Sequence, residues 1–166
     1  MLKKKKYVFL LLAMLLPMDN KHATLTYTHT GLVDAILTPV ELYYDVYDEI
    51  TSYLTNALWD TGAMLSVISP EVAAKLNLDV VDNIRIAGIN SESLVEVAVI
   101  SIHFPNGAVI EDIRVAICNM SPGNEMIIGM DVITKMDFAV TNGRGQTQFS
   151  FAIPPFEDRI DFAKRV

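Results

Sequence analysis

The chain has little of what disulfide-linked and metal-binding proteins require. It contains one cysteine, Cys118, in 166 residues, so no internal disulfide and no multi-cysteine metal site can form. Its three histidines, His22, His29 and His103, share no ligand spacing with one another or with a nearby pair of carboxylates. We therefore expect no metal ion, and nothing in the sequence indicates a cofactor.

Basic residues are also scarce. The chain has 13 Lys and Arg against 20 Asp and Glu, a formal net charge of −7. Residues 1–20 carry four lysines and one aspartate, so the remainder carries about −10. Nucleic-acid binding needs clustered Lys and Arg that displace counterions. The acidic body therefore excludes nucleic acid as an expected partner.

No apolar run is long enough to form the usual transmembrane helix of ~20 residues. The longest, residues 7–16, follows the basic residues 1–6 and has the length of a signal-peptide core. Residues 17–20 offer no small-x-small cleavage site, so residues 1–20 read as a signal-like or anchor-like segment, or as an extension without a targeting role. Localisation stays open between export, membrane association through residues 7–16, and the cytoplasm.

The most informative sequence that is present is Asp60-Thr61-Gly62-Ala63, between the apolar runs 57–59 and 64–68. A carboxylate delivered from an apolar strand onto a glycine turn is unfavourable unless the site uses it, because an unpaired buried charge is heavily penalised. Asp60 is therefore a candidate reactive group. The alternative is an Asx turn, in which the side chain of Asp60 only bonds its own backbone.

A second apolar strand, residues 126–128, ends on Gly129 and is followed by residues that read as the first turn of a helix. Together with a glycine-bearing hairpin between them, the two features resemble the retropepsin family of aspartic proteases, single-domain relatives of the retroviral protease. The resemblance covers roughly residues 54–151. Gly129 reads as a tight strand-to-helix join.

Most of the expected elements are short strands. Ser69 and Pro70 predict a short helix ending near Asn77, and Asn106-Gly107 predicts a two-residue hairpin turn. We expect an all-β domain over residues 21–153, folded as a closed or nearly closed retropepsin-like barrel with a flap hairpin and one or two short helices. A charged tail, 154–166, follows. The strands are expected within 32–53, 80–86, 94–100, 109–117, 138–140 and 148–151.

Aspartic-protease chemistry needs two carboxylates at one water, one ionised and one protonated. The chain has one Asp-Thr-Gly sequence, and Asp131 is expected to cap the helix after Gly129. The simplest solution is a two-fold homodimer that pairs Asp60 with its copy. Carboxylates about 4 Å apart repel by roughly 4 kcal/mol at an effective dielectric near 20, so the pair shares one proton; aspartic proteases are the known example.

The resemblance implies a role for each matching residue. Asp60, Thr61 and Gly62 would be the catalytic triplet, with Thr61 bracing the dimer and Gly62 leaving its backbone open to substrate. An extended peptide would lie beneath the flap and present apolar side chains. The residues expected to bind it are Ala63, Val67 and Ile127 in the pockets and Gly88 and Ile89 at the flap tip. Trp59, Met64 and Leu65 depart from the family pattern, so subsite preferences do not transfer.

Three functions follow, and the first is favoured. The chain would be a homodimeric aspartic endopeptidase. It would otherwise be a retropepsin-like peptide-binding or dimerisation module without turnover, although such a module has little physical reason to keep the Asp60 carboxylate. A carboxylate-based glycosidase would need two acids flanking one cleft, and no such pair is evident in the sequence. The hairpin read as the flap could equally be an ordinary exposed hairpin.

Overall fold

A computed structural model describes residues 22–46, 49–87, 92–158 and 161–164 of the chain. The N-terminal segment 1–20 and the expected flap tip, Gly88 and Ile89, lie outside the described residues. Both predictions therefore stay predictions.

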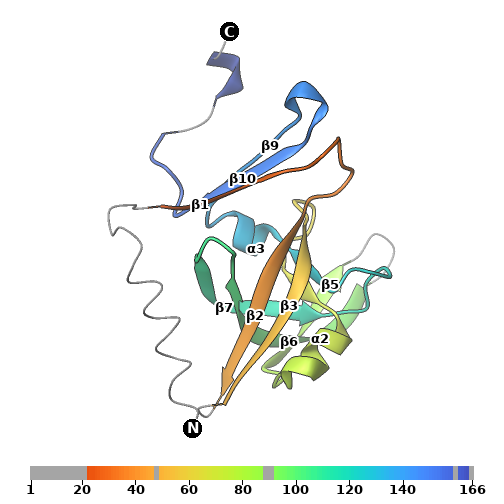
Figure 1. Cartoon of the computed structure of the whole chain (residues 1–166). Coiled ribbons are helices and arrows are strands. Elements are labelled where there is room, and N and C mark those ends of the chain that lie inside the picture. The colour runs from red at the N-terminus through yellow and green to blue at the C-terminus, as the bar shows by residue number, and fades with distance from the viewer. Residues whose placement is uncertain (1–21, 47–48, 88–91, 159–160, 165–166) are drawn as a thin grey trace.

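The larger of two sheets closes on itself. Six strands follow one another in the order β2-β3-β8-β4-β7-β6, and β2 also pairs with β6, which completes a barrel (Figure 1). A seventh strand, β5 (Asp82–Ala87), pairs with β6 at the edge of this sheet. The predicted all-β, closed architecture is confirmed. The barrel strands are β2 (Leu37–Val46), β3 (Glu49–Trp59), β4 (Val67–Ile68), β6 (Glu92–His103), β7 (Val109–Ile117) and β8 (Met126–Ile128).

The smaller sheet has three strands in the order β1-β10-β9 and lies above the barrel in Figure 1. They are β1 (Ala23–Thr28), β9 (Asp137–Thr141) and β10 (Gln148–Ile153). The sequence analysis did not predict β1. Its alternation of threonine with Leu25 and Tyr27 was the available signal, and the structure places Leu25 opposite Phe151 of β10.

Two short α-helices occur in the described part of the chain, α2 (Pro70–Leu76) and α3 (Met130–Ile133). The α2 helix matches its prediction: the Ser69 side chain accepts a hydrogen bond from the Val72 N–H at 3.2 Å, and Asn77 ends the helix in a left-handed conformation. Val72 and Leu76 are fully buried, so the capped helix packs one face on the barrel core. Two 3-10 turns, Gly143–Gly145 and Phe162–Lys164, complete the helical elements.

The turn between β6 and β7 differs from its prediction. Phe104 N donates to Ala108 O at 2.9 Å and Gly107 N donates to Phe104 O at 2.9 Å, which makes a loop of three residues instead of two. Gly107 has a positive φ of 84°, as the third residue of such a loop requires. The Asn-Gly signal located the turn correctly, but the paired strands are joined by a loop that is one residue longer than predicted.

One aromatic cluster joins the two sheets. The Trp59 ring lies 4.8 to 6.0 Å from four phenylalanine rings, and its Nε1 donates to Thr38 Oγ1 at 2.9 Å. Trp59 ends β3 of the barrel and Phe104 directly follows β6, whereas the other three phenylalanines lie on β9 and β10, so the cluster joins the two sheets in a single core. Its members are Trp59, Phe104, Phe138, Phe149 and Phe151.

No helix within the described ranges is long and apolar enough to cross a lipid bilayer, and residues 7–16 lie outside those ranges. The start of the expected tail contacts the small sheet: Phe156 N donates to Asp137 Oδ2 at 2.8 Å, and the Phe156 ring lies 4.3 Å from the His22 ring. The domain limits 21–153 and 154–166 remain predictions.

Candidate active site

Asp60 stands where strand β3 leaves the barrel. Strands β3 and β8 run parallel, with Trp59 opposite Ile128, and one further backbone bond from Asp60 N to Ile128 O at 3.0 Å extends the pairing to Asp60 itself. Trp59 is buried and anchors the strand end from the other side. The backbone of the acid is therefore fixed by the barrel and not by a free loop.

The Asp60 carboxylate is held by the turn that follows it. Gly62 N donates to Asp60 Oδ1 at 2.8 Å, so the Asx turn considered as an alternative is present. This bond uses one carboxylate oxygen. Among the described residues no other hydrogen bond or ion pair reaches the half-buried Asp60 side chain. The turn orients the acid and leaves its second oxygen available, so the two readings of Asp60 are compatible.

The loop after Asp60 is tied to the β8–α3 junction. Met130 N donates to Ala63 O at 2.8 Å and Asp131 N donates to Met64 O at 3.2 Å. Close approach makes this possible: a Cβ on Gly129 would lie 2.6 Å from the carbonyl carbon of Leu65. Gly129 is therefore required by space and not by an unusual φ, since its φ is −94°.

A buried serine links the same two segments. Ser66 Oγ donates to Asp131 Oδ1 at 2.9 Å and accepts from Gly129 N at 3.1 Å. Asp131 lies in the first turn of α3, where its charge was expected, but the capping bond is absent: Gly129 occupies the cap position without a side-chain bond. The Asp131 carboxylate accepts from Ser66 Oγ instead. The sequence analysis missed Ser66, and only tertiary contact reveals its role.

The other predicted site residues fall into two groups. Thr61 and Gly62 are exposed on the turn, open to a partner or substrate. Val67 and Ile127 lie opposite each other on antiparallel strands β4 and β8, and both are half-buried, as is Ala63. The structure places these residues in the Asp60 loop or on the adjoining strands β4 and β8, and their binding roles remain predictions.

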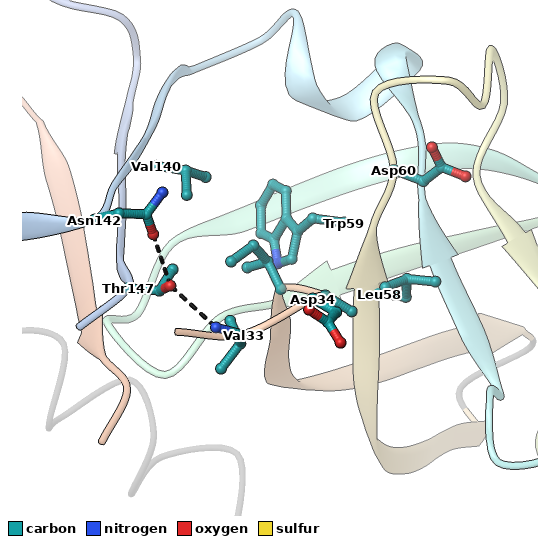
Figure 2. Close-up of a pocket in the computed structure, with 10 residues that line it drawn as sticks. Val33, Asp34, Leu58, Trp59, Asp60, Val140, Asn142 and Thr147 are labelled. Atoms are coloured by element: carbon teal, nitrogen blue, oxygen red, sulfur yellow. Dashed lines mark hydrogen bonds between the residues drawn. The ribbon is translucent and has the colours of Figure 1, made fainter. Parts of the chain in front are cut away.

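A cleft of about 450 Å³ lies on the other side of Asp60. It separates the end of β3 from the segment before β2 and from the β9–β10 hairpin, as Figure 2 shows. Two carboxylates, Asp34 and Asp60, line it, and the sequence analysis did not anticipate Asp34 there. The lining comprises Val33, Asp34, Ala35, Ile36, Leu58, Trp59, Asp60, Val140, Asn142 and Thr147.

A polar network supports β3 and the chain entering β8. The Glu125 carboxylate accepts bonds from Thr55 Oγ1 at 2.8 Å and from the Tyr53 hydroxyl at 2.9 Å, and these bonds, Thr55 first, lower the pKa of Glu125. Lys75 of α2 donates to the Tyr53 hydroxyl at 2.7 Å, which raises the pKa of Lys75. The network therefore fastens α2 to β3 and to the chain that enters β8.

The described lining of the cleft contains no histidine and no cysteine. The rings of His103 and Tyr43 stack with their centroids 4.0 Å apart, and burial lowers the pKa of His103. Burial also raises the pKa of the Cys118 thiol, which disfavours a reactive thiolate. Among the described residues, no group of three or more His, Cys, Asp and Glu side chains could hold a metal ion.

The family of the chain follows from a comparison of its sequence with protein-family models. The model described as aspartyl protease matches residues 49–132, from the start of β3 into α3, which is half of the chain. The chain belongs to the aspartyl protease family, and the predicted family is confirmed. No curated protein matches the chain.

Solved structures that are similar to this one include three proteases or protease-like domains. A retropepsin-like aspartic protease from Rickettsia conorii is 12% identical, with 82% of this chain and 99% of that chain covered and a TM-score of 0.49. The EIAV protease, solved with an inhibitor, is 21% identical, with 64% and 91% covered and a TM-score of 0.45. The retroviral protease-like domain of Ddi1 from Leishmania major is 17% identical, with 65% and 82% covered and a TM-score of 0.41.

Proposed function

We propose that this chain is an aspartic endopeptidase that acts as a homodimer on peptide or protein substrates. The observation that carries the proposal is the setting of Asp60. Its backbone is fixed by Ile128, one carboxylate oxygen is held by Gly62, and the other has no bond from a described residue, beside a cleft. Membership of the aspartyl protease family supports a role for this acid in peptide hydrolysis.

The second acid would come from a second copy of the chain. The sequence contains one Asp-Thr-Gly, and the Asp131 carboxylate is engaged with Ser66. A two-fold axis near the exposed Thr61 and Gly62 would bring two Asp60 carboxylates together. Met64, with 77% of its surface exposed on the same loop, is an apolar side chain that such an interface would cover.

The chemistry of the pair needs no covalent intermediate with the protein. The ionised carboxylate takes a proton from water as the water oxygen adds to the scissile carbonyl carbon, and the protonated carboxylate donates to the carbonyl oxygen. Collapse of the tetrahedral species then breaks the C–N bond, and the amine leaves with a proton from the pair. Activity should peak at acidic to near-neutral pH and fall on both sides.

The first test compares the wild-type protein with Asp60→Asn on a peptide library at several pH values. We expect the variant to lose all cleavage while its sedimentation and unfolding midpoint stay those of the wild type. If neither form cleaves any peptide, the alternative of a retropepsin-like binding or dimerisation module is the better description. A flat wild-type activity profile from about pH 4 to about pH 9 would contradict the shared-proton mechanism.

The second test asks whether one active site uses two chains. Equal amounts of wild type and Asp60→Asn are unfolded together, refolded and assayed at constant total protein. If every site needs both carboxylates, random pairing leaves about one quarter of the wild-type activity. If each chain works alone, about one half remains, and the dimeric mechanism is wrong.

A further inference from the structure

The cleft beside Asp60 has a charge pattern that its apolar walls do not explain. Val33, Ile36, Leu58 and Val140 supply apolar surface, whereas its two charged members, Asp34 and Asp60, are both acids. None of the described lining residues is cationic. A bound side chain therefore meets an apolar wall and a negative potential together.

The side chains of Asn142 and Thr147 in the lining bond to each other. Thr147 Oγ1 donates to Asn142 Oδ1 at 2.7 Å and accepts from Val33 N at 3.2 Å, as the dashed lines in Figure 2 show. The Asp34 carboxylate has no hydrogen bond or ion pair from any residue that the structure describes. Apart from Asp60, it is the group best placed to recognise a ligand.

We propose that Asp34 selects lysine or arginine in the cleft next to the scissile bond. The aliphatic stem of either residue would pack on Val33, Ile36 and Leu58 while its charged end reaches the Asp34 carboxylate. The cleft volume of about 450 Å³ is within the range of ligand sites. Asp60 lies at the edge of the same cleft, with its carboxylate directed away from the other labelled residues (Figure 2). A residue held in the cleft would therefore lie near the bond that is cut. This proposal rests on the proposed function for its account of cleavage.

The test uses peptides of one sequence in which a single position holds Lys, Met or Glu, with that position moved along the peptide. At one position near the cut, the wild type should prefer Lys over Met by roughly threefold to tenfold in kcat/KM, as expected for a partly solvated ion pair. The preference should shrink at about 1 M salt, where the Debye length is about 3 Å.

Three variants identify the residue responsible. Asp34→Asn should reduce the ratio of Lys to Met cleavage to near one, and Asp34→Lys should turn the preference toward Glu. Asp45→Asn, the same substitution at an exposed position near the far end of β2, should leave the ratio unchanged. A wild-type enzyme with no preference for Lys, or a preference that survives Asp34→Asn, overturns the proposal.

Binding separates this proposal from the proposed function. Fluorescence anisotropy of the same peptides needs no turnover, so Lys selectivity that depends on Asp34 in a protein that never cleaves would sustain the proposal and remove the protease. Complete loss of cleavage of every peptide by Asp34→Asn would instead make Asp34 part of the acid pair. Dissociation of the dimer in Asp34→Asn without any change in peptide selectivity would assign the cleft to the partner chain. Either of these two results overturns the selectivity role.

Discussion

The lack of a side chain at Gly129 lets the Asp60 loop pack closely against the β8–α3 junction. Gly129→Ala would place a methyl group 2.6 Å from the carbonyl carbon of Leu65, so the loop and the β8–α3 junction must separate. We expect a loss of roughly 1–3 kcal/mol in the free energy of unfolding and a larger proportional loss of activity, because Asp60 moves with the loop. Urea unfolding and peptide cleavage measure the two effects.

The matched control for that change is Gly143→Ala. A Cβ on Gly143 would meet no atom within 4 Å, and the φ of Gly143 is not positive. Both the free energy of unfolding and the activity should therefore stay close to wild type. If Gly129→Ala behaves like the control, the close approach does not constrain the loop.

Ser66 and Asp131 give a prediction that tests which aspartate is reactive. Ser66→Ala leaves the buried Gly129 N–H without its acceptor and should reduce the free energy of unfolding by about 1–3 kcal/mol. Asp131→Asn keeps an oxygen that accepts from Ser66 Oγ, so it should cost less and retain cleavage. Cleavage abolished by Asp131→Asn in a folded dimer would place Asp131 in the acid pair.

At the scale of elements, the Glu125 network joins α2, β3 and the entry to β8. Hydrogen bonds from Thr55 and then Tyr53 lower the folded-state pKa of Glu125. The ionised Glu125 therefore stabilises the fold at pH values above its unfolded-state pKa of about 4.3. That contribution is lost as the pH falls through the lower folded-state pKa. Stability should therefore decline on acidification partly through this one carboxylate.

The measurement compares Glu125→Gln with wild type by urea unfolding across acidic pH. At neutral pH the variant should be less stable by about 1 kcal/mol, and the difference should vanish once the wild-type carboxylate is protonated. Glu96→Gln, at an exposed position of β6, serves as the control. A difference that stays constant with pH would show that ionisation of Glu125 is not the cause.

Elements with a strong local signal were predictable. Helix α2 carries its own start and stop in Ser69, Pro70 and Asn77, and β7 is bounded by a glycine turn. Strand β1 was missed because its partner, β10, is far away in sequence, and the exact β6–β7 loop depends on register, which local residues do not encode.

The site divides in the same way. The turn at Asp60 and Gly62 and the tight join at Gly129 were predictable because the sequence shows an apolar strand followed by a glycine at each place. The bond between Ser66 and Asp131, and the presence of Asp34 in the cleft, depend on segments that meet only in the folded chain. Asp34 lies in a loop, and no sequence signal distinguishes a loop aspartate that lines a cleft from one that only contacts solvent.

At the scale of the whole molecule, the cluster around Trp59 should make the two sheets unfold as one cooperative unit. Phe149 is fully buried against Trp59, so Phe149→Ala should reduce the free energy of unfolding by about 3–5 kcal/mol. Trp59 is the chain's one tryptophan, and its fluorescence therefore reports on the junction between the sheets. In wild type, fluorescence and far-ultraviolet circular dichroism should give the same unfolding midpoint.

Different midpoints from the two measurements would show that the two sheets unfold separately. If fluorescence changes at lower denaturant than circular dichroism, the small sheet detaches before the barrel unfolds and the two are separate units. Val140→Ala is a control on the same sheet, since Val140 is 40% exposed and its truncation should have a small effect.

The pairing of β1 with β10 has a consequence for biosynthesis. Thr26 and Ser150, which share a hydrogen bond across these strands, are 124 residues apart, and the Asp60 loop likewise awaits Gly129. A ribosome adds about 5–20 residues per second, so β1 would remain unpaired for several seconds or longer before β10 emerges. The Asp60 loop would therefore reach its folded geometry only after Gly129 has left the ribosome, and β1 would pair only after β10 has emerged.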